Sequence, residues 1–179
     1  MRKLLIASLL SGLGTTAMAQ TNVQVYGLAD MYLGHGKSSN TYKQTRANEG
    51  GYAATQLGFR GTEDLGGGLK ALFNFEMGIS MDTGNGNLPG PNLSFTRQSW
   101  VGLGGGWGTV TMGRQYTPLF RVTWRPDPYG VNSIFSPIVL WAQTEGQPGL
   151  LPWASRADNA VMYASPTNLP IQGALMYAP

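Results

Sequence analysis

Leu69-Lys70-Ala71-Leu72-Phe73-Asn74-Phe75-Glu76-Met77 alternates between apolar and polar side chains. The odd-numbered positions are all apolar, whereas the even-numbered positions include Lys70, Asn74 and Glu76. Successive side chains of a β-strand point to opposite faces of its sheet. The stretch is therefore predicted to form a strand with one apolar face and one largely polar face.

The same alternation occurs on both sides of this stretch. Within 23–33 the odd-numbered positions are apolar or Gly, and the even-numbered ones include Gln24 and Asp30. Within 56–62 the apolar and Gly positions again alternate with polar ones. Together with similar runs further along, these patterns predict strands at about 23–33, 54–64, 69–79, 96–104, 108–116, 158–164 and 171–177.

The links between the predicted strands alternate in length. The long links are 34–53, 80–95 and 117–157, and the short links are 65–68, 105–107 and 165–170. Outer-membrane barrels have short periplasmic turns at one end and longer extracellular loops at the other. Several predicted strands are also close to the roughly 9–11 residues that cross a bilayer at a tilt. The links therefore favour an all-β fold, a transmembrane antiparallel β-barrel.

Membrane physics explains why such strands would close into a barrel. Backbone N–H and C=O groups find no partner in hydrocarbon, so a spanning sheet needs every edge paired. The apolar face would then meet lipid and the polar face would line a lumen. A half-buried strand of a soluble sandwich alternates too, which leaves two rivals open. These are a secreted β-sandwich that binds sugars through exposed Trp and Tyr, and a small closed barrel that serves as an adhesin or anchor.

The N-terminus indicates export. Met1-Arg2-Lys3 is positively charged, Leu4 to Gly14 is an apolar run, and Ala17-Met18-Ala19 is a small-residue cleavage site. This order is typical of a secretory signal peptide. We expect residues 1–19 to be removed, leaving Gln20 as the first mature residue.

Charge and cysteine content exclude other classes of protein. The chain has 12 Lys and Arg against 9 Asp and Glu, so losing Arg2 and Lys3 leaves ten against nine, a net charge of +1. Without a basic cluster, no nucleic-acid partner is expected. The absence of Cys excludes a disulfide scaffold.

The motifs of enzymes and cofactor sites are weak. The single His, His35, falls in the first long link, and no G-x-S-x-G, H-E-x-x-H or Cys motif accompanies it. Gly66-x-Gly68-x-x-Ala71 fits the spacing of a dinucleotide site, but a strand pattern follows it where a helix is needed. We expect neither an enzyme nor a cofactor, and no metal site.

Several ordered segments resemble one family, the general porins of Gram-negative bacteria, and within it the β-proteobacterial branch. They are Val25-Tyr26-Gly27, Leu57 to Leu65, Gly66 to Ala71, Val101-Gly102-Leu103, Trp107 to Tyr116 and Ser155 to Tyr163. The resemblance implies a passive channel in the outer membrane for small hydrophilic solutes and ions. It also implies a homotrimer in contact with membrane lipid. Barrels of this type have roughly 16–18 strands, so about seven strands out of roughly sixteen suggest an N-terminal part, residues 20–179, that cannot close alone.

The resemblance also assigns candidate site residues. Porins carry inward basic residues on the barrel wall, and a constriction loop with acidic groups opposes them. Arg60, Arg97 and Arg156 match wall positions, while Gln56 replaces a usual Arg. The constriction loop is expected within about 117–157, and its charged residues are Arg121, Arg125, Asp127 and Glu145. The excess of basic groups predicts a mild preference for anions, because rings of charged side chains set the local field in a pore.

Two arginines do not follow the simple alternation. Arg97 shares the parity of the apolar Val101 and Leu103, so the sequence leaves its face open. Arg114 shares the parity of Val110 and Met112. In the family the equivalent Arg meets a neighbouring subunit, which makes Arg114 a candidate interface residue, with a plain residue at the barrel mouth as the alternative.

Overall fold

A computed structural model describes residues 22–37, 43–86, 93–129, 136 and 155–179. The expected signal peptide 1–19 and Glu145 lie outside these residues. Within the described residues, no helix has the length and apolar character needed to cross a membrane.

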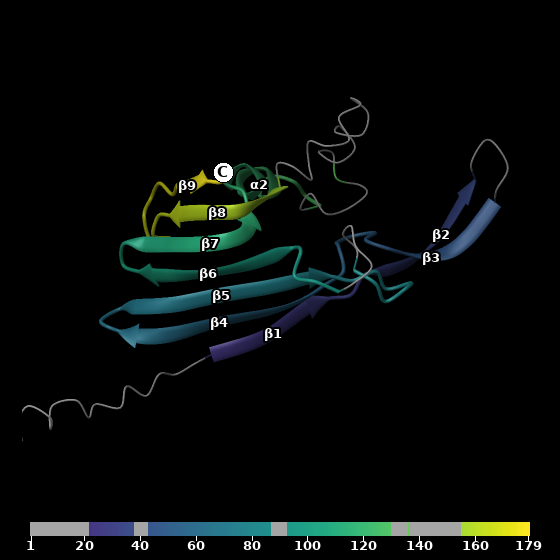
Figure 1. The fold of residues 1–179 in the computed structure, drawn as a ribbon. Coiled ribbons are helices and arrows are strands. Elements are labelled where there is room, and N and C mark those ends of the chain that lie inside the picture. Colours follow the sequence, from purple (N-terminus) through teal and green to yellow (C-terminus); the bar gives the residue numbers. More distant parts are fainter. Residues whose placement is uncertain (1–21, 38–42, 87–92, 130–135, 137–154) are drawn as a thin grey trace, which may run out of the picture.

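One antiparallel sheet of seven strands forms the body of the structure, in the order β1-β4-β5-β6-β7-β8-β9 (Figure 1). Its strands are β1 (Asn22–Leu28), β4 (Gln56–Gly66), β5 (Leu69–Gly78), β6 (Gln98–Gly105), β7 (Gly108–Tyr116), β8 (Arg156–Ala164) and β9 (Ala174–Tyr177). The seven-strand meander is confirmed, and the short and long connections lie at opposite ends of the strands, as Figure 1 shows. In the described part of the chain β1 and β9 each pair on one side alone, so the sheet is an open wall.

The first long link is more ordered than the sequence indicates. The predicted strand 23–33 ends at Leu28, and a separate hairpin follows, made of β2 (Met31–Lys37) and β3 (Lys43–Glu49). Asp30 causes the break, because its Oδ2 accepts hydrogen bonds from the backbone N–H of Tyr52 (2.6 Å) and Ala53 (2.7 Å). These bonds join the two ends of the hairpin segment. The other strand ends differ from the prediction by up to three residues.

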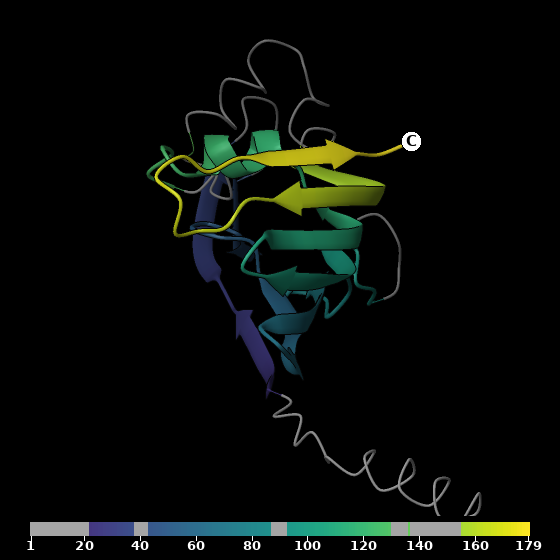
Figure 2. The same cartoon turned by 90° about the vertical axis from the view of Figure 1, so that its left-hand side faces the viewer.

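A short helix, α2 (Pro118–Trp124), opens the third long link, where the sequence predicted a loop. Thr117 caps it by accepting a hydrogen bond at Oγ1 from the N–H of Phe120 (3.1 Å), and Pro118 occupies a position where no N–H is needed. The ring of Phe120 stacks on that of Tyr116 with centroids 4.8 Å apart. The helix lies beside β9 in both Figure 1 and Figure 2.

The sheet exposes apolar side chains on one face and buries polar side chains on the other, which is the reverse of a soluble protein. Apolar side chains on one face are exposed, including Val101 (54%) and Met112 (57%). Polar side chains on the other are buried, including Glu76 (3%) and Gln115 (0%). We call these the apolar face and the polar face. A sandwich would cover this apolar face with a second sheet, and among the described residues no second sheet covers it.

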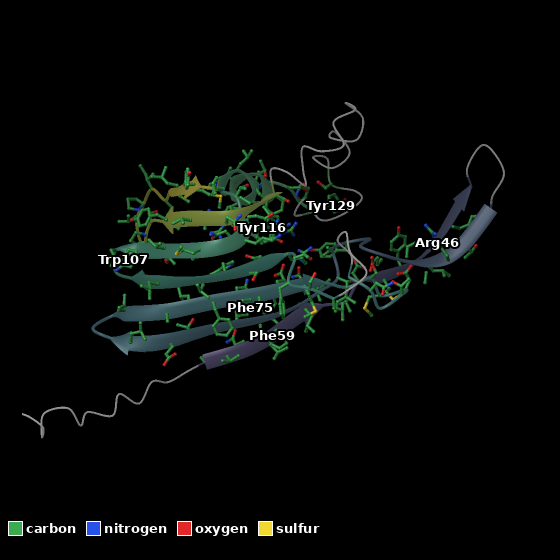
Figure 3. The ribbon with its side chains drawn as sticks, viewed as in Figure 1. Arg46, Phe59, Phe75, Trp107, Tyr116 and Tyr129 are labelled. Carbon is green, nitrogen blue, oxygen red and sulfur yellow. The ribbon has the colours of Figure 1, made fainter. Side chains whose placement is uncertain are left out.

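The register carries the apolar face across the whole wall. One row of paired positions runs through all seven strands and contains a single small residue among apolar ones: Val23, Gly61, Phe73, Val101, Met112, Val161 and Tyr177. Phe59 and Phe75, paired on β4 and β5, extend the same face (Figure 3). The sheet is also twisted, since its strands change direction from β4 to β9 in Figure 2. Such a surface fits the hydrocarbon side of a barrel wall.

Candidate functional site

A continuous polar network crosses six strands on the polar face. It starts on β1 and ends on β8, and its members are Gln24, Arg60, Tyr26, Asn74, Glu76, Gln98, Arg97, Tyr116 and Arg156. Each link is a hydrogen bond, an ion pair or a cation–π contact. The network therefore holds several charged groups in fixed positions along the wall.

Tyr26 joins the first half of the network. Its hydroxyl lies 2.8 Å from both Asn74 Oδ1 and Glu76 Oε2, and the guanidinium of Arg60 lies 5.1 Å from its ring centroid. The ring passes directly over Gly58, where an added Cβ would meet the Tyr26 ring at 2.4 Å. A side chain at position 58 would therefore displace Tyr26 from Glu76.

Arg60 remains exposed although it has partners. Its Nε donates to Gln24 Oε1 (3.0 Å), and both residues occupy the same row of the polar face. In the described residues no carboxylate pairs with it. Its positive charge is therefore exposed on the polar face of the sheet.

Arg97 lies on the polar-face side, which answers the question that its parity left open. Arg97 precedes the first residue of β6, so the alternation of side chains along that strand does not determine its direction. Its Nε donates to Glu76 Oε1 at 2.8 Å, and the two side chains are 7% and 4% exposed. The charge of Arg97 is thus compensated by a buried carboxylate.

Tyr116 joins Arg97 to Arg156. Its hydroxyl oxygen accepts hydrogen bonds from Nη2 of Arg97 (3.0 Å) and Nη2 of Arg156 (2.9 Å). The Arg156 guanidinium also lies 4.6 Å from the Tyr116 ring centroid. Its Nε is buried and has no hydrogen-bond partner among the described residues. Two cations thus share one neutral acceptor.

The loop residues divide into free and engaged charges. Asp127 is buried, and its carboxylate accepts hydrogen bonds from the Tyr129 N–H (2.8 Å) and the Ser136 hydroxyl. Arg125, at the end of α2, is exposed and has no ion-pair partner in the described ranges. Arg121, within α2, is half-buried, and desolvation lowers the pKa of its guanidinium. Arginine stays protonated in proteins, so Arg121 keeps its charge.

Gln56 and the loop face each other across a cavity of about 600 Å³. Gln56 and Leu28 line it from the wall, while Trp124, Arg125 and Tyr129 line it from the loop. The structure thus brings one predicted wall residue together with two predicted loop residues, Arg125 and Asp127. Arg60, Arg97 and Arg156 belong instead to the polar network.

Arg114 does not join the network. Gly113 has a φ of +126°, and the pairing with β8 shifts between Gly113 and Gln115, which marks a bulge. Arg114 pairs with Ser99 in the apolar-face register, and its guanidinium contacts the Thr96 carbonyl and Asp158. It therefore lies on the opposite side of the sheet from the polar network.

Sequence reasoning proposed three members of the polar network, Arg60, Arg97 and Arg156, as site residues. It missed the other six, and three of these hold the network together: Glu76, Tyr26 and Tyr116. Glu76 was assigned to the polar face of its strand, but nothing in the sequence paired it with Arg97. Tyr26 shares the even parity of Gln24, and this signal was available. Tyr116 carried no signal, because its position depends on the bulge after Gly113.

Comparisons with known proteins agree on one family. The pattern of the family described as Gram-negative porin matches residues 6–179. An outer membrane porin protein of Bordetella pertussis is 30% identical over 99% of this chain and 48% of its own length. Outer membrane porin protein 32 of Delftia acidovorans is 33% identical over 93% of this chain and 46% of its own.

A solved structure shows the same architecture. The anion-selective porin from Comamonas acidovorans superposes with a TM-score of 0.72 at 30% identity, covering 89% of this chain and 47% of its own. An OmpT variant of Vibrio cholerae, 17% identical with a TM-score of 0.57, shares the fold. The chain spans about half the length of these relatives.

Proposed function

Because the chain belongs to the Gram-negative porin family, we propose that its protein is a channel for passive diffusion of small hydrophilic solutes and ions. Its location is the outer membrane, as for the outer membrane porins it matches. The observation that carries the proposal is the reversed burial of the sheet, with exposed Val101 and Met112 on one face and buried Glu76 and Gln115 on the other. A water-filled barrel needs that arrangement, because its outer face meets lipid.

We assign the two sides of the channel as follows. The wall contributes Gln56, Arg60, Arg97 and Arg156. The constriction loop, within about 117–157, contributes Arg121, Arg125, Asp127 and Glu145. Support comes from the cavity that Gln56 shares with Arg125, and from the position of the three wall arginines in the polar network.

The channel prefers anions mildly. Among the described site residues, five arginines face two carboxylates, Glu76 and Asp127, which gives a net charge of +3. Both carboxylates are engaged, Glu76 by Arg97 and Asp127 by groups of its own loop. A relative of the same fold carries the description anion-selective porin, and fixed positive charge at a constriction raises the local anion concentration.

The full protein assembles as a homotrimer in the lipid bilayer, with Arg114 at a subunit contact. Its place on the apolar face, where charge is costly beside lipid, supports this assignment. Asp158, its partner within the chain, is 68% exposed, so the pair can accept a further polar group from a neighbouring subunit.

Planar-bilayer recording of the full-length gene product tests the channel. Stepwise currents and a reversal potential displaced toward that of the anion are expected under a KCl gradient. A folded, detergent-purified protein that inserts and carries no current would refute the channel, and a cation-directed reversal potential would refute the anion preference.

A further inference from the structure

The cavity between the third loop and the wall combines an apolar surface with a free charge. Trp124 and Tyr129 line it from the third loop, Leu28 lines it from the end of β1, and Tyr52 lines it from the link between β3 and β4. The three aromatic side chains are 41% to 66% exposed. The volume of about 600 Å³ falls within the range of small-molecule pockets. Exposed aromatic groups that converge on one cavity favour an apolar or aromatic ligand.

The exposed charge at the cavity is the guanidinium of Arg125. Asp127 also lines it, but this carboxylate is buried and accepts hydrogen bonds from Tyr129 and Ser136 within the loop. Arg125 is exposed and has no ion-pair partner in the described residues. Gln56 adds an amide, which can donate to an oxygen ligand. A carboxylate therefore has a guanidinium and an amide to bind it.

We propose that this cavity binds small organic anions that join a carboxylate to an aromatic ring, and so gives the channel a preference for arenecarboxylates. The carboxylate pairs with Arg125, and the ring packs against Trp124 and Tyr129. The inference rests on the proposed channel function, since the cavity selects solutes only where the polar face lines a pore. It adds a binding step to an otherwise passive charge preference.

The test compares three solutes in planar bilayers that contain the full-length protein. Benzoate carries both features, acetate lacks the ring, and benzyl alcohol lacks the charge. Benzoate is expected to lower the single-channel current saturably, while acetate and benzyl alcohol do so at concentrations at least about fivefold higher. Equal effects of benzoate and acetate would overturn the proposal.

Variants locate the effect. Trp124→Ala and Arg125→Gln are each expected to weaken benzoate block about fivefold or more. Trp107→Ala is the matched control, because Trp107 is also exposed (47%) but lies at the other end of the sheet from Tyr129 (Figure 3). Equal weakening by Trp124→Ala and Trp107→Ala would overturn the assignment of the site.

Calorimetric titration of benzoate into the detergent-purified protein separates the two proposals. Binding that Arg125→Gln weakens, in a protein without current, would retain the cavity and refute the channel. Currents without detectable benzoate binding would retain the channel and refute the cavity.

Discussion

Arg97 and Glu76 form a buried ion pair with 2.8 Å between Nε and Oε1. Desolvating two charges is costly, and removing either partner of a buried pair leaves the other charge uncompensated. Arg97 is one of the three arginines proposed for the wall. Because Glu76 compensates its charge, Arg97 contributes little to the electrostatic field on the polar side of the sheet. Under the proposed assignment, the net positive charge of the site comes from Arg60, Arg156 and the loop arginines.

Glu76→Gln should raise the anion preference. The substitution leaves Arg97 uncompensated and increases the net charge of the site by one, which should raise the anion-to-cation permeability ratio about twofold. Reversal potentials of the full-length channel under a KCl gradient measure this ratio. A shift toward cations would contradict the assignment of Glu76 as a compensating group.

Removing the whole pair should leave selectivity almost unchanged. The double variant Glu76→Gln/Arg97→Gln conserves net charge, so its reversal potential should match that of the unmodified channel, whereas Arg97→Gln alone should shift toward cations. Each single variant should also lower the free energy of unfolding by about 3–5 kcal/mol, because it leaves one buried charge unpaired. Urea unfolding from lipid vesicles measures that cost, and additive single effects would exclude coupling.

The apolar face predicts at which positions a charged side chain destabilises the protein in the membrane. Met112→Lys places an ammonium on the apolar face in the middle of β7 and should cost about 2–4 kcal/mol in lipid. Thr109→Lys, three residues earlier on the polar face, is the control and should cost far less. Unfolding of both variants from vesicles measures the two costs in free energy. Equal costs would contradict the assignment of the apolar and polar faces.

Asp30→Ala should loosen the first hairpin segment. The substitution removes the bonds to Tyr52 and Ala53, and losing about 2 kcal/mol of local stability should speed hydrogen exchange of these two amides roughly thirtyfold. Asp82→Ala provides the control, because Asp82 is exposed and makes no side-chain hydrogen bond among the described residues. Unchanged exchange rates in Asp30→Ala would show that other contacts hold the segment.

Arg114 should affect assembly more than its partner does. If it meets a neighbouring subunit, Arg114→Ala should lower the temperature at which the trimer dissociates by more than Asp158→Ala does. The internal pair alone is worth about 1 kcal/mol or less, since Asp158 is 68% exposed. Heating followed by electrophoresis under native conditions measures dissociation, and equal shifts would assign Arg114 to the internal pair.

The sequence by itself determined the presence and order of the seven strands of the sheet, and the two faces of the strands that alternate regularly. In a strand with period-two alternation, the odd-numbered side chains lie on one face and the even-numbered ones on the other. Links such as 65–68 are so short that the next strand must run antiparallel to the one before it. The placement of Arg60 on the polar face followed from the same parity. These features are local, so neighbouring residues suffice to specify them.

Only the tertiary structure decided which charges are free. Glu76 and Arg97 are 21 residues apart and meet because strands pair, while Tyr116 reaches both arginines because a bulge shifts the register at Gly113. Asp30 likewise ended the first strand through bonds to residues more than 20 positions away. Each of these contacts depends on distances between segments that are distant in sequence, and no local pattern encodes such distances.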